Sequence, residues 1–246
     1  MSAAAQKVWL AGVDGCVGGW LVAFVRPDGA VAPPPRVVPG FAEILSAPEA
    51  PAVVAVDIPV GLPERVGSGG RMAENAVRPL LGARQSSVFS VPSRAAIYAQ
   101  DYREACRIAL ATSEPPRQVS KQFFNIAPKI REVDAYLRAA PEVAARVFEV
   151  HPELAFWRLN GGHTLDQPKK IKNRPHEPGL TLRRRLLMSA VEQAVNAQPP
   201  KGAGADDLLD ALACAAIARR ILAGLAQPFP DPPPRDSYGL TMAIWV

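Results

Sequence analysis

The chain has 246 residues, a length that suits one large domain or two small ones, and its 48% hydrophobic content is enough for a packed core. We expect a single domain spanning residues 1–246. Its apolar runs are too short to span a membrane, and the first ten residues lack the pattern of a secretory signal, so we expect a cytoplasmic protein with no membrane partner. The three cysteines and three histidines show no CxxC or HExxH spacing, which argues against a disulfide framework and the common zinc sites. The net charge of +5 permits a nucleic-acid partner.

The first part of the chain has the patterns of short strands. Apolar runs at residues 8–14 and 19–25 flank a glycine-rich turn and predict a β-hairpin, with a third strand expected within residues 30–38. A short helix is expected at 41–49. The β-branched run within residues 51–63 stops at a proline turn, which is typical of a strand buried on both faces.

Helical periodicity then fills residues 71 to about 140, and its last segment opens with Pro128 at a position typical of a first helical turn. A strand, two helices and a closing edge strand follow, and they are expected at residues 146–152, 180–195, 204–221 and 240–246. Because strands come first and then alternate with helices, the fold class is α/β with a mixed sheet.

Carboxylates stand at the ends of several apolar elements. Asp14 and Asp57 each lie where a buried strand runs out, and Glu149 lies in the strand expected at 146–152. Burying a carboxylate without a partner is costly, so this set of acids predicts a shared metal site. The alternative for each residue alone is a turn-forming acid that hydrogen-bonds to nearby backbone.

The helix expected at 204–221 begins with three aspartates. Asp207 and Asp210 lie on the face that continues, by three- and four-residue spacing, to Cys214. The acidic stripe is therefore also the buried stripe, and its carboxylates need a positive partner. Asp206 is the better candidate for a plain helix cap.

Several longer motifs carry a resemblance to a known family. They are GVDGCVGGW, AVDIPVGLP, QSSVFSVPSRAA, VSKQFFNIAPKIREVD, FEVHPE and GADDLLDALA. Together they resemble, in order and over nearly the whole chain, the predicted RNase H-like nucleases known as domain of unknown function family 429. The segment DLLDALA also resembles the last helix of RuvC-type junction resolvases. The resemblance implies an RNase H-like fold: a hairpin-led mixed sheet of five strands flanked by helices, with a helical insertion at about 60–140 after the fourth strand.

The same resemblance implies roles for the acids and a cofactor. The implied catalytic residues are Asp14, Asp57, Asp207 and Asp210, and the implied metal ligands are these four and Glu149. Oxygen ligands without histidine or cysteine suit Mg²⁺ or Mn²⁺. Two such ions would activate a water and stabilise the leaving oxygen of a phosphodiester. The chain departs from the family pattern at Val17, where a basic residue is common.

Basic and hydroxyl side chains supply candidates for phosphate binding. The residues expected to hold substrate are Arg84, Ser86, Ser87, Arg94, Lys121, Lys129 and Arg131. The alternatives are an ordinary loop for the serine segment and surface ion pairs on a helix for the last residues. The basic runs at 168–176 and 183–185 are interpreted as a solvated loop and a helix face, and the loop would add nucleic-acid affinity from outside the catalytic pocket.

Two functions of different class remain open. The first is a metal-dependent nuclease that acts on nucleic acid by a two-metal mechanism. The alternative is a non-catalytic nucleic-acid or ligand-binding module that keeps the RNase H-like fold. Sugar-kinase-like ATPases also begin with a GxD strand, but they need a second glycine-rich phosphate loop, which this sequence lacks.

Overall fold

The chain forms two compact units in the computed structural model, which describes residues 8–27, 33–172 and 174–246, apart from the side chains of residues 192 and 193. The first unit comprises Met1–Asp57 and Gln167–Ala226, and the second comprises Ile58–Asp166 and Gln227–Val246. Each unit has its own sheet strands, helices and buried apolar side chains. The expectation of one domain over residues 1–246 stays a prediction.

The first unit begins with strands and ends with two long helices. Its elements are β1 (Leu10–Cys16), β2 (Gly19–Val25), β3 (Arg36–Val38), α1 (Phe41–Leu45), β4 (Val53–Val56), β6 (Lys170–Ile171), β7 (Arg174–Pro175), α8 (Glu177–Val195) and α9 (Ala205–Leu222). The strand order is β3-β2-β1-β4, in which β1 is antiparallel to β2 and parallel to β4. This arrangement confirms the predicted hairpin and the buried strand after it.

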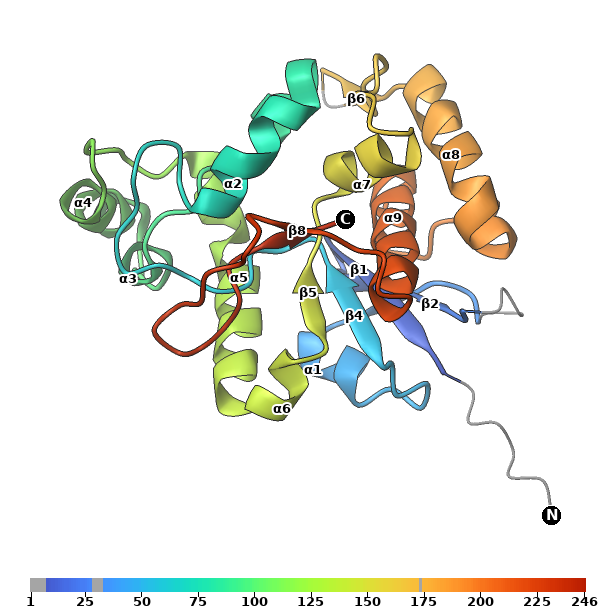
Figure 1. Ribbon diagram of the computed structural model, residues 1–246, viewed down its shortest axis with the longest axis horizontal. Coiled ribbons are helices and arrows are strands. Elements are labelled where there is room, and N and C mark those ends of the chain that lie inside the picture. The colour runs from blue at the N-terminus through green and yellow to red at the C-terminus, as the bar shows by residue number, and fades with distance from the viewer. Residues whose placement is uncertain (1–7, 28–32, 173) are drawn as a thin grey trace. The chain divides into compact units, whose positions relative to one another are not determined.

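Helix α9 packs directly on the sheet of the first unit, as Figure 1 shows. The contact is close because β1 carries Gly12: a β-carbon there would lie 2.1 Å from the carbonyl oxygen of Ala211 and 2.2 Å from the amide nitrogen of Ala215. Residues Leu208–Ala218 of α9 are all buried. A helix that is apolar around most of its surface is expected in such an interior position.

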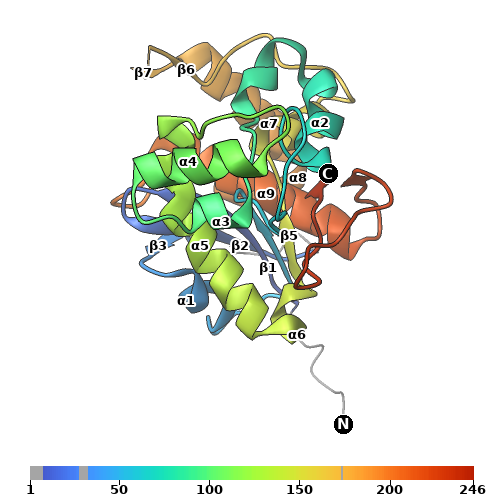
Figure 2. The ribbon, with the colours of Figure 1, turned by 90° about the vertical axis from the view of Figure 1, so that its left-hand side faces the viewer.

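The second unit is mainly helical. Its elements are α2 (Met72–Val77), the 3-10 helix η1 (Arg78–Ser87), α3 (Arg94–Ile97), α4 (Tyr102–Thr112), α5 (Lys121–Ala139), α6 (Pro141–Ala144), β5 (Val147–Glu149), α7 (Pro152–Leu159), β8 (Pro228–Phe229) and β9 (Ile244–Trp245). Helices α3, α4 and α5 pack together, and the view in Figure 2 looks onto them. Within the described ranges of the chain, no helix is long and apolar enough to cross a membrane.

Three details of the fold differ from the sequence expectations. Apart from the two-stranded β6–β7 hairpin, the described residues form four sheet strands in the first unit and three in the second, seven in place of the expected five. The closing strand β9 is not at an edge, because it pairs with β5 on one side and β8 on the other. Helix α5 does not begin at Pro128 but at Lys121, where Ser120 caps it by accepting a hydrogen bond from the Phe123 amide at 3.1 Å.

Proline inside α5 removes a backbone donor and crowds the preceding turn, which ordinarily ends a helix. Here the helix continues through Pro128. The side chains of Phe123, Ala127 and Ile130 on either side of this position are buried. Burial of that apolar face therefore offsets the cost of the proline. This tertiary effect cannot be predicted from the proline and its sequence neighbours alone.

Candidate functional site

Asp14 and Asp57 lie side by side in register at the carboxyl ends of two parallel strands. Val13 pairs with Val56, and the Asp57 amide donates a hydrogen bond to the Val13 carbonyl at 2.9 Å. Side chains alternate along a strand, so Asp14 projects from the same face as Gly12, the face on which α9 packs. The register therefore directs two acids towards the beginning of that helix.

The first turn of α9 supplies more carboxylates. The Oδ2 atom of Asp207 accepts a hydrogen bond from the Gly204 amide at 2.8 Å, so Asp207 caps the helix. Asp206 was the expected cap and this is wrong, because its carboxylate forms an ion pair with the ammonium of Lys170 at 2.5 Å. Asp210 is 3% exposed and lies one turn further along the helix.

Mutual repulsion shows that these acids form one cluster. Burial raises the pKa of Asp14 well above its usual range, and the charges of Asp57, Asp210 and Asp207 raise it further. The same cluster, after burial, raises the pKa of the Cys214 thiol, which therefore stays neutral. We call Asp14, Asp57, Asp207 and Asp210 the acidic cluster, and all four belong to the first unit.

A lysine is the positive partner of the acidic cluster. The ammonium of Lys169 forms an ion pair with Asp210. Burial lowers the pKa of Lys169, but the carboxylates of Asp210, Asp14 and Asp57 more than offset this and hold it well above its usual range. Lys169 is therefore charged at every pH at which the fold is expected to be stable.

The backbone around Lys169 is fixed by helix α8. The His176 amide donates to the Lys169 carbonyl at 2.9 Å, and His176 Nδ1 lies 3.1 Å from the Pro168 carbonyl. The fully buried Arg183 donates to the carbonyls of Gln167 and Gly179, each at 3.0 Å. The expectation that the basic segment lies wholly outside the site and is solvated is therefore wrong for Lys169. The run at 183–185 is likewise not wholly a solvated face.

The donor chemistry of the acidic cluster suits a hard divalent cation, because every charged oxygen comes from a carboxylate. However, among the residues that the structure describes, no three histidine, cysteine, aspartate or glutamate side chains are grouped so that they could hold a metal ion. The ammonium of Lys169 is the cation that the cluster contacts. The carboxylate oxygens thus suit Mg²⁺ or Mn²⁺. In this structure, however, the acidic cluster faces the ammonium of Lys169, which forms an ion pair with Asp210.

The sequence of the chain matches the model of one protein family. The model described as "Protein of unknown function (DUF429)" matches residues 12–235. The chain belongs to this family. Comparisons with curated proteins and with solved structures gave no match. The DUF429 match includes the acidic cluster and the segment that carries Lys169.

Glu149 of this DUF429 chain lies in the second unit, in an ion-pair network of its own. Its Oε1 atom accepts a hydrogen bond from Arg71 at 2.6 Å, and its Oε2 atom accepts one from the Val60 amide at 2.8 Å. Arg71 also pairs with Glu74 at 2.7 Å. Burial raises the pKa of Glu149 to about 7, although Arg71 opposes this shift. Both carboxylate oxygens have protein donors, and a role as metal ligand stays a prediction.

Arg94 was expected to hold phosphate, and the structure places it in a buried network. Its guanidinium contacts Asp236 at 2.6 Å and Asp134 at 2.9 Å, and it lies 4.5 Å from the ring centroid of Tyr238. Asp134 also accepts a hydrogen bond from the hydroxyl of Tyr98 at 2.8 Å. The carboxylates of Asp134 and Asp236 therefore neutralise the charge of Arg94 within the second unit.

The serine segment of the DUF429 chain closes the 3-10 helix η1. Ser86 is exposed, and the Ser87 hydroxyl donates to the Arg84 carbonyl at 2.8 Å. The side chain of Arg84 is half-buried. Two of the three candidates thus contact each other through a local turn.

The remaining basic candidates lie on α5. The ammonium of Lys121 lies 5.0 Å from the ring centroid of Tyr102, and Lys129 is half-buried. Arg131 donates hydrogen bonds to the carbonyls of Ile97 and Ala99 at 3.0 and 3.1 Å. Arg131 therefore links α3 to α5, whereas Lys121 keeps an exposed surface position.

Sequence reasoning missed Lys169, Arg183 and the Arg71–Glu149 pair. Lys169 stands in a proline-bounded polar stretch without helical or strand periodicity, which resembles a solvated loop. The one available signal was the buried acidic stripe of α9, which required a positive partner without saying where in the sequence it lies.

Proposed function

We propose that the protein is a divalent-metal-dependent nuclease of RNase H-like fold that cleaves phosphodiester bonds in the cytoplasm. The observation that carries the proposal is the burial of Asp14 against Asp57 and Asp210. Carboxylates that repel one another destabilise a fold, so such clusters are typical of sites where cations bind or chemistry occurs. The family to which the chain belongs is described without a function, so the proposal stands on this cluster and on the resemblance of its motifs.

In this proposal Asp14, Asp57 and Asp210 hold Mg²⁺ or Mn²⁺, and Asp207 contributes while capping α9. The ions, when bound, supply an activated water and a charge that stabilises the leaving oxygen. Lys169 neutralises the acids in the metal-free protein. Its side chain is 30% exposed, so the ammonium can turn away from Asp210 towards solvent.

Nucleic acid is the proposed partner, and the β6–β7 hairpin offers it positive charge. Lys172 and Arg174 are exposed in this hairpin, while Lys169 and Lys170 are engaged by acids of α9. Exposed bases bind phosphates without selecting sequence, largely by releasing counterions. The hairpin would therefore provide affinity, and the acidic cluster would provide the chemistry.

The test is a cleavage assay on single- and double-stranded DNA and RNA with Mg²⁺ or Mn²⁺, paired with direct measurement of Mn²⁺ binding by electron paramagnetic resonance. Asp14→Asn and Asp210→Asn are expected to lose both cleavage and Mn²⁺ binding, and EDTA is expected to stop cleavage. Asp166→Asn, at an exposed acid, is the matched control and should keep both. Cleavage that survives EDTA or the cluster substitutions would overturn the proposal.

A non-catalytic binding module is the second candidate. It is favoured by the two lysine–aspartate pairs on α9 and by the lack, among the described residues, of a ready group of three metal ligands. In this case the wild type would bind nucleic acid equally well in EDTA, and Asp14→Asn would leave that binding unchanged. No cleavage would be observed with either cation.

A further inference from the structure

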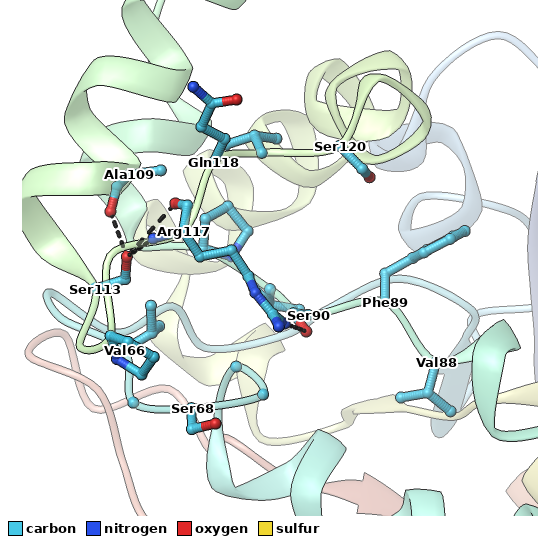
Figure 3. A pocket seen from close by; sticks show the side chains of 17 residues that line it. Val66, Ser68, Val88, Phe89, Ser90, Ala109, Ser113, Arg117, Gln118 and Ser120 are labelled. Atoms are coloured by element: carbon cyan, nitrogen blue, oxygen red, sulfur yellow. Dashed lines mark hydrogen bonds between the residues drawn. The ribbon is translucent and has the colours of Figure 1, made fainter.

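The second unit contains a cavity of about 260 Å³ that is separate in sequence from every acid of the cluster. It is lined by the glycine-rich turn 67–70, by the segment 88–92 and by the segment 117–120 (Figure 3). No aspartate or glutamate is among the residues that line it. A concave site with a few polar groups on an apolar wall is typical of small-molecule binding.

Two guanidinium groups converge on one hydroxyl at this cavity. Arg78 donates to Ser90 Oγ at 3.0 Å, and Arg117 donates to the same oxygen at 3.5 Å. Figure 3 shows the side chain of Arg117 extended towards Ser90. Since like charges repel, a pair of arginines held this close favours an anion between or beside them.

The charge of the two arginines is not balanced by an ion pair within the part of the chain that the structure describes. Arg78 is held by carbonyls, at 2.6 Å from Gly69 and 3.1 Å from Val88. Burial and the charge of Arg117 lower the pKa of Arg78, against the opposing effect of Glu74. Glu74 itself is engaged by Arg71 through both of its carboxylate oxygens.

Arg117 is positioned by its own backbone. Its amide donates to the hydroxyl of Ser113 at 2.8 Å, and that hydroxyl donates to the Ala109 carbonyl at 2.7 Å. The side chain of Arg117 is exposed and makes a long contact to Ser90, so most of its donors are available to a ligand. The fold thus places the guanidinium of Arg117 at the cavity, and no ion pair to a carboxylate of the described residues neutralises its charge.

The remaining wall of the cavity combines polar side chains, among them Ser68 and Gln118, with an apolar part. In the apolar part, Phe89 is half-buried, and Val88, Val91 and Val119, which line the same cavity, are buried. A cavity lined by an aromatic ring and by valine side chains suits a flat apolar group. The volume of the cavity restricts the ligand to a small molecule.

We propose that this cavity binds a small organic anion that joins a planar apolar ring to a carboxylate or a phosphate ester. Arg117 and Ser90 hold the anionic group beside the Gly67–Gly70 turn, and the ring lies against Phe89 and the valines. This site does not depend on the nuclease proposal, because none of its residues belongs to the acidic cluster.

The test uses four probes and three variants of the full chain. Benzoate and phenyl phosphate carry ring and charge, benzamide keeps the ring without charge, and inorganic phosphate keeps the charge without the ring. Binding is followed by the amide resonances of Gly67, Gly69 and Gly70 in heteronuclear NMR. The variants are Arg117→Gln, Phe89→Leu and the control Arg107→Gln, whose side chain is 73% exposed on α4. Thermal melting checks that each variant folds.

Benzoate or phenyl phosphate is expected to bind saturably and to shift these glycine resonances, and which of the two binds more tightly identifies the anionic group. Loss of a charge-assisted contact in Arg117→Gln should weaken that binding by about tenfold or more. Phe89→Leu should weaken it less, and Arg107→Gln should leave it unchanged. The proposal is overturned if neither organic anion binds, if benzamide or inorganic phosphate binds as tightly as the tighter of the two organic anions, or if Arg117→Gln and Arg107→Gln behave alike.

Discussion

The ammonium of Lys169 forms an ion pair with Asp210, so a base that precedes α8 neutralises an acid of α9 from 41 positions away in the sequence. The pair stands within the acidic cluster and also interacts electrostatically with Asp14 and Asp57. A built-in cation of this kind lets four acids remain together in the folded protein when no metal ion is present. It also means that any metal ion must compete with an ammonium for the same carboxylates.

Replacing Lys169 by glutamine should lower the stability of the metal-free protein and raise its affinity for Mn²⁺. An acid left without its buried partner costs about 3 kcal/mol, and the vacated charge makes room for the metal ion. Urea denaturation in EDTA and Mn²⁺ titration measure the two effects. Lys172→Gln, at an exposed position in the same hairpin, is the control and should change neither. Unchanged stability in Lys169→Gln would show that the pair contributes nothing.

Replacing Asp14 by asparagine should leave the protein, in EDTA, as stable at pH 7 as the wild type or more stable by about 1 kcal/mol. The pKa of Asp14 is raised above the value of 3.8 that it has in an unfolded chain. The folded wild type therefore binds more protons than the unfolded chain above about pH 4, and its unfolding free energy falls as pH rises. The variant lacks this titration, so its advantage should grow between pH 4 and pH 7. A large loss of stability at pH 7 would instead indicate a structural hydrogen-bonding role for Asp14.

Replacing Arg183 by methionine should destabilise the protein by about 2 kcal/mol, because a buried carbonyl, of Gly179, and a partly buried one, of Gln167, lose a charged donor. The segment that carries Lys169 should loosen, and the His176 amide, which donates to the Lys169 carbonyl, should exchange with solvent faster. The neighbouring Arg184 forms an ion pair with the exposed Glu177, so Arg184→Met should change stability by less than about 0.5 kcal/mol. Equal effects of the two substitutions would contradict the anchoring role of Arg183.

If the protein binds nucleic acid, neutralising Lys172 and Arg174 together should flatten the salt dependence of that binding. Each lost contact to a duplex phosphate lowers the slope of log affinity against log salt by about 0.9. Cleavage at saturating substrate should stay nearly constant. Titrations at several salt concentrations, with single-turnover cleavage alongside, measure both quantities. A collapse of cleavage with unchanged binding would place these two bases in the chemistry.

Replacing Gly12 by alanine should destabilise the protein by about 3 kcal/mol, because the added methyl group would overlap the backbone of α9. Thermal and urea denaturation measure the loss. At Gly67 a β-carbon would meet nothing within 4 Å, so Gly67→Ala is the control and should be nearly neutral. A mild effect at Gly12 would mean that α9 can move away from β1 without cost.

The strands and the last helix could be predicted because their signals are local. The alternating and apolar runs of β1, β2 and β4 specify burial by themselves, and so does the apolar face of α9. The start of α5 could not be predicted correctly, since Pro128 is a strong local signal that tertiary packing overrides. The position of β9 between two strands depends on pairing partners, which the sequence of β9 does not encode.

The acids of the candidate site could be predicted because buried carboxylates are rare and stand out at strand ends. Their partners could not. The position of Lys169 is determined by hydrogen bonds from His176 and by the fully buried Arg183, and none of these contacts has a sequence pattern. Asp207 caps the helix and Asp206 pairs with Lys170, the reverse of the expected roles. The two residues are adjacent, and a helix start cannot be predicted to within one residue.

The absence of a side chain at Gly12 also has a consequence for how the site tolerates change. Because β1 and α9 meet backbone to backbone at this point, the spacing between Asp14 and Asp210 is set by main-chain atoms rather than by the sizes of the surrounding apolar side chains. Substitutions elsewhere in the apolar core of this unit can then alter stability while leaving the distance between the two acids in place. The geometry of the acidic cluster is therefore little affected by sequence changes among the apolar core residues, and it depends chiefly on the presence of Gly12.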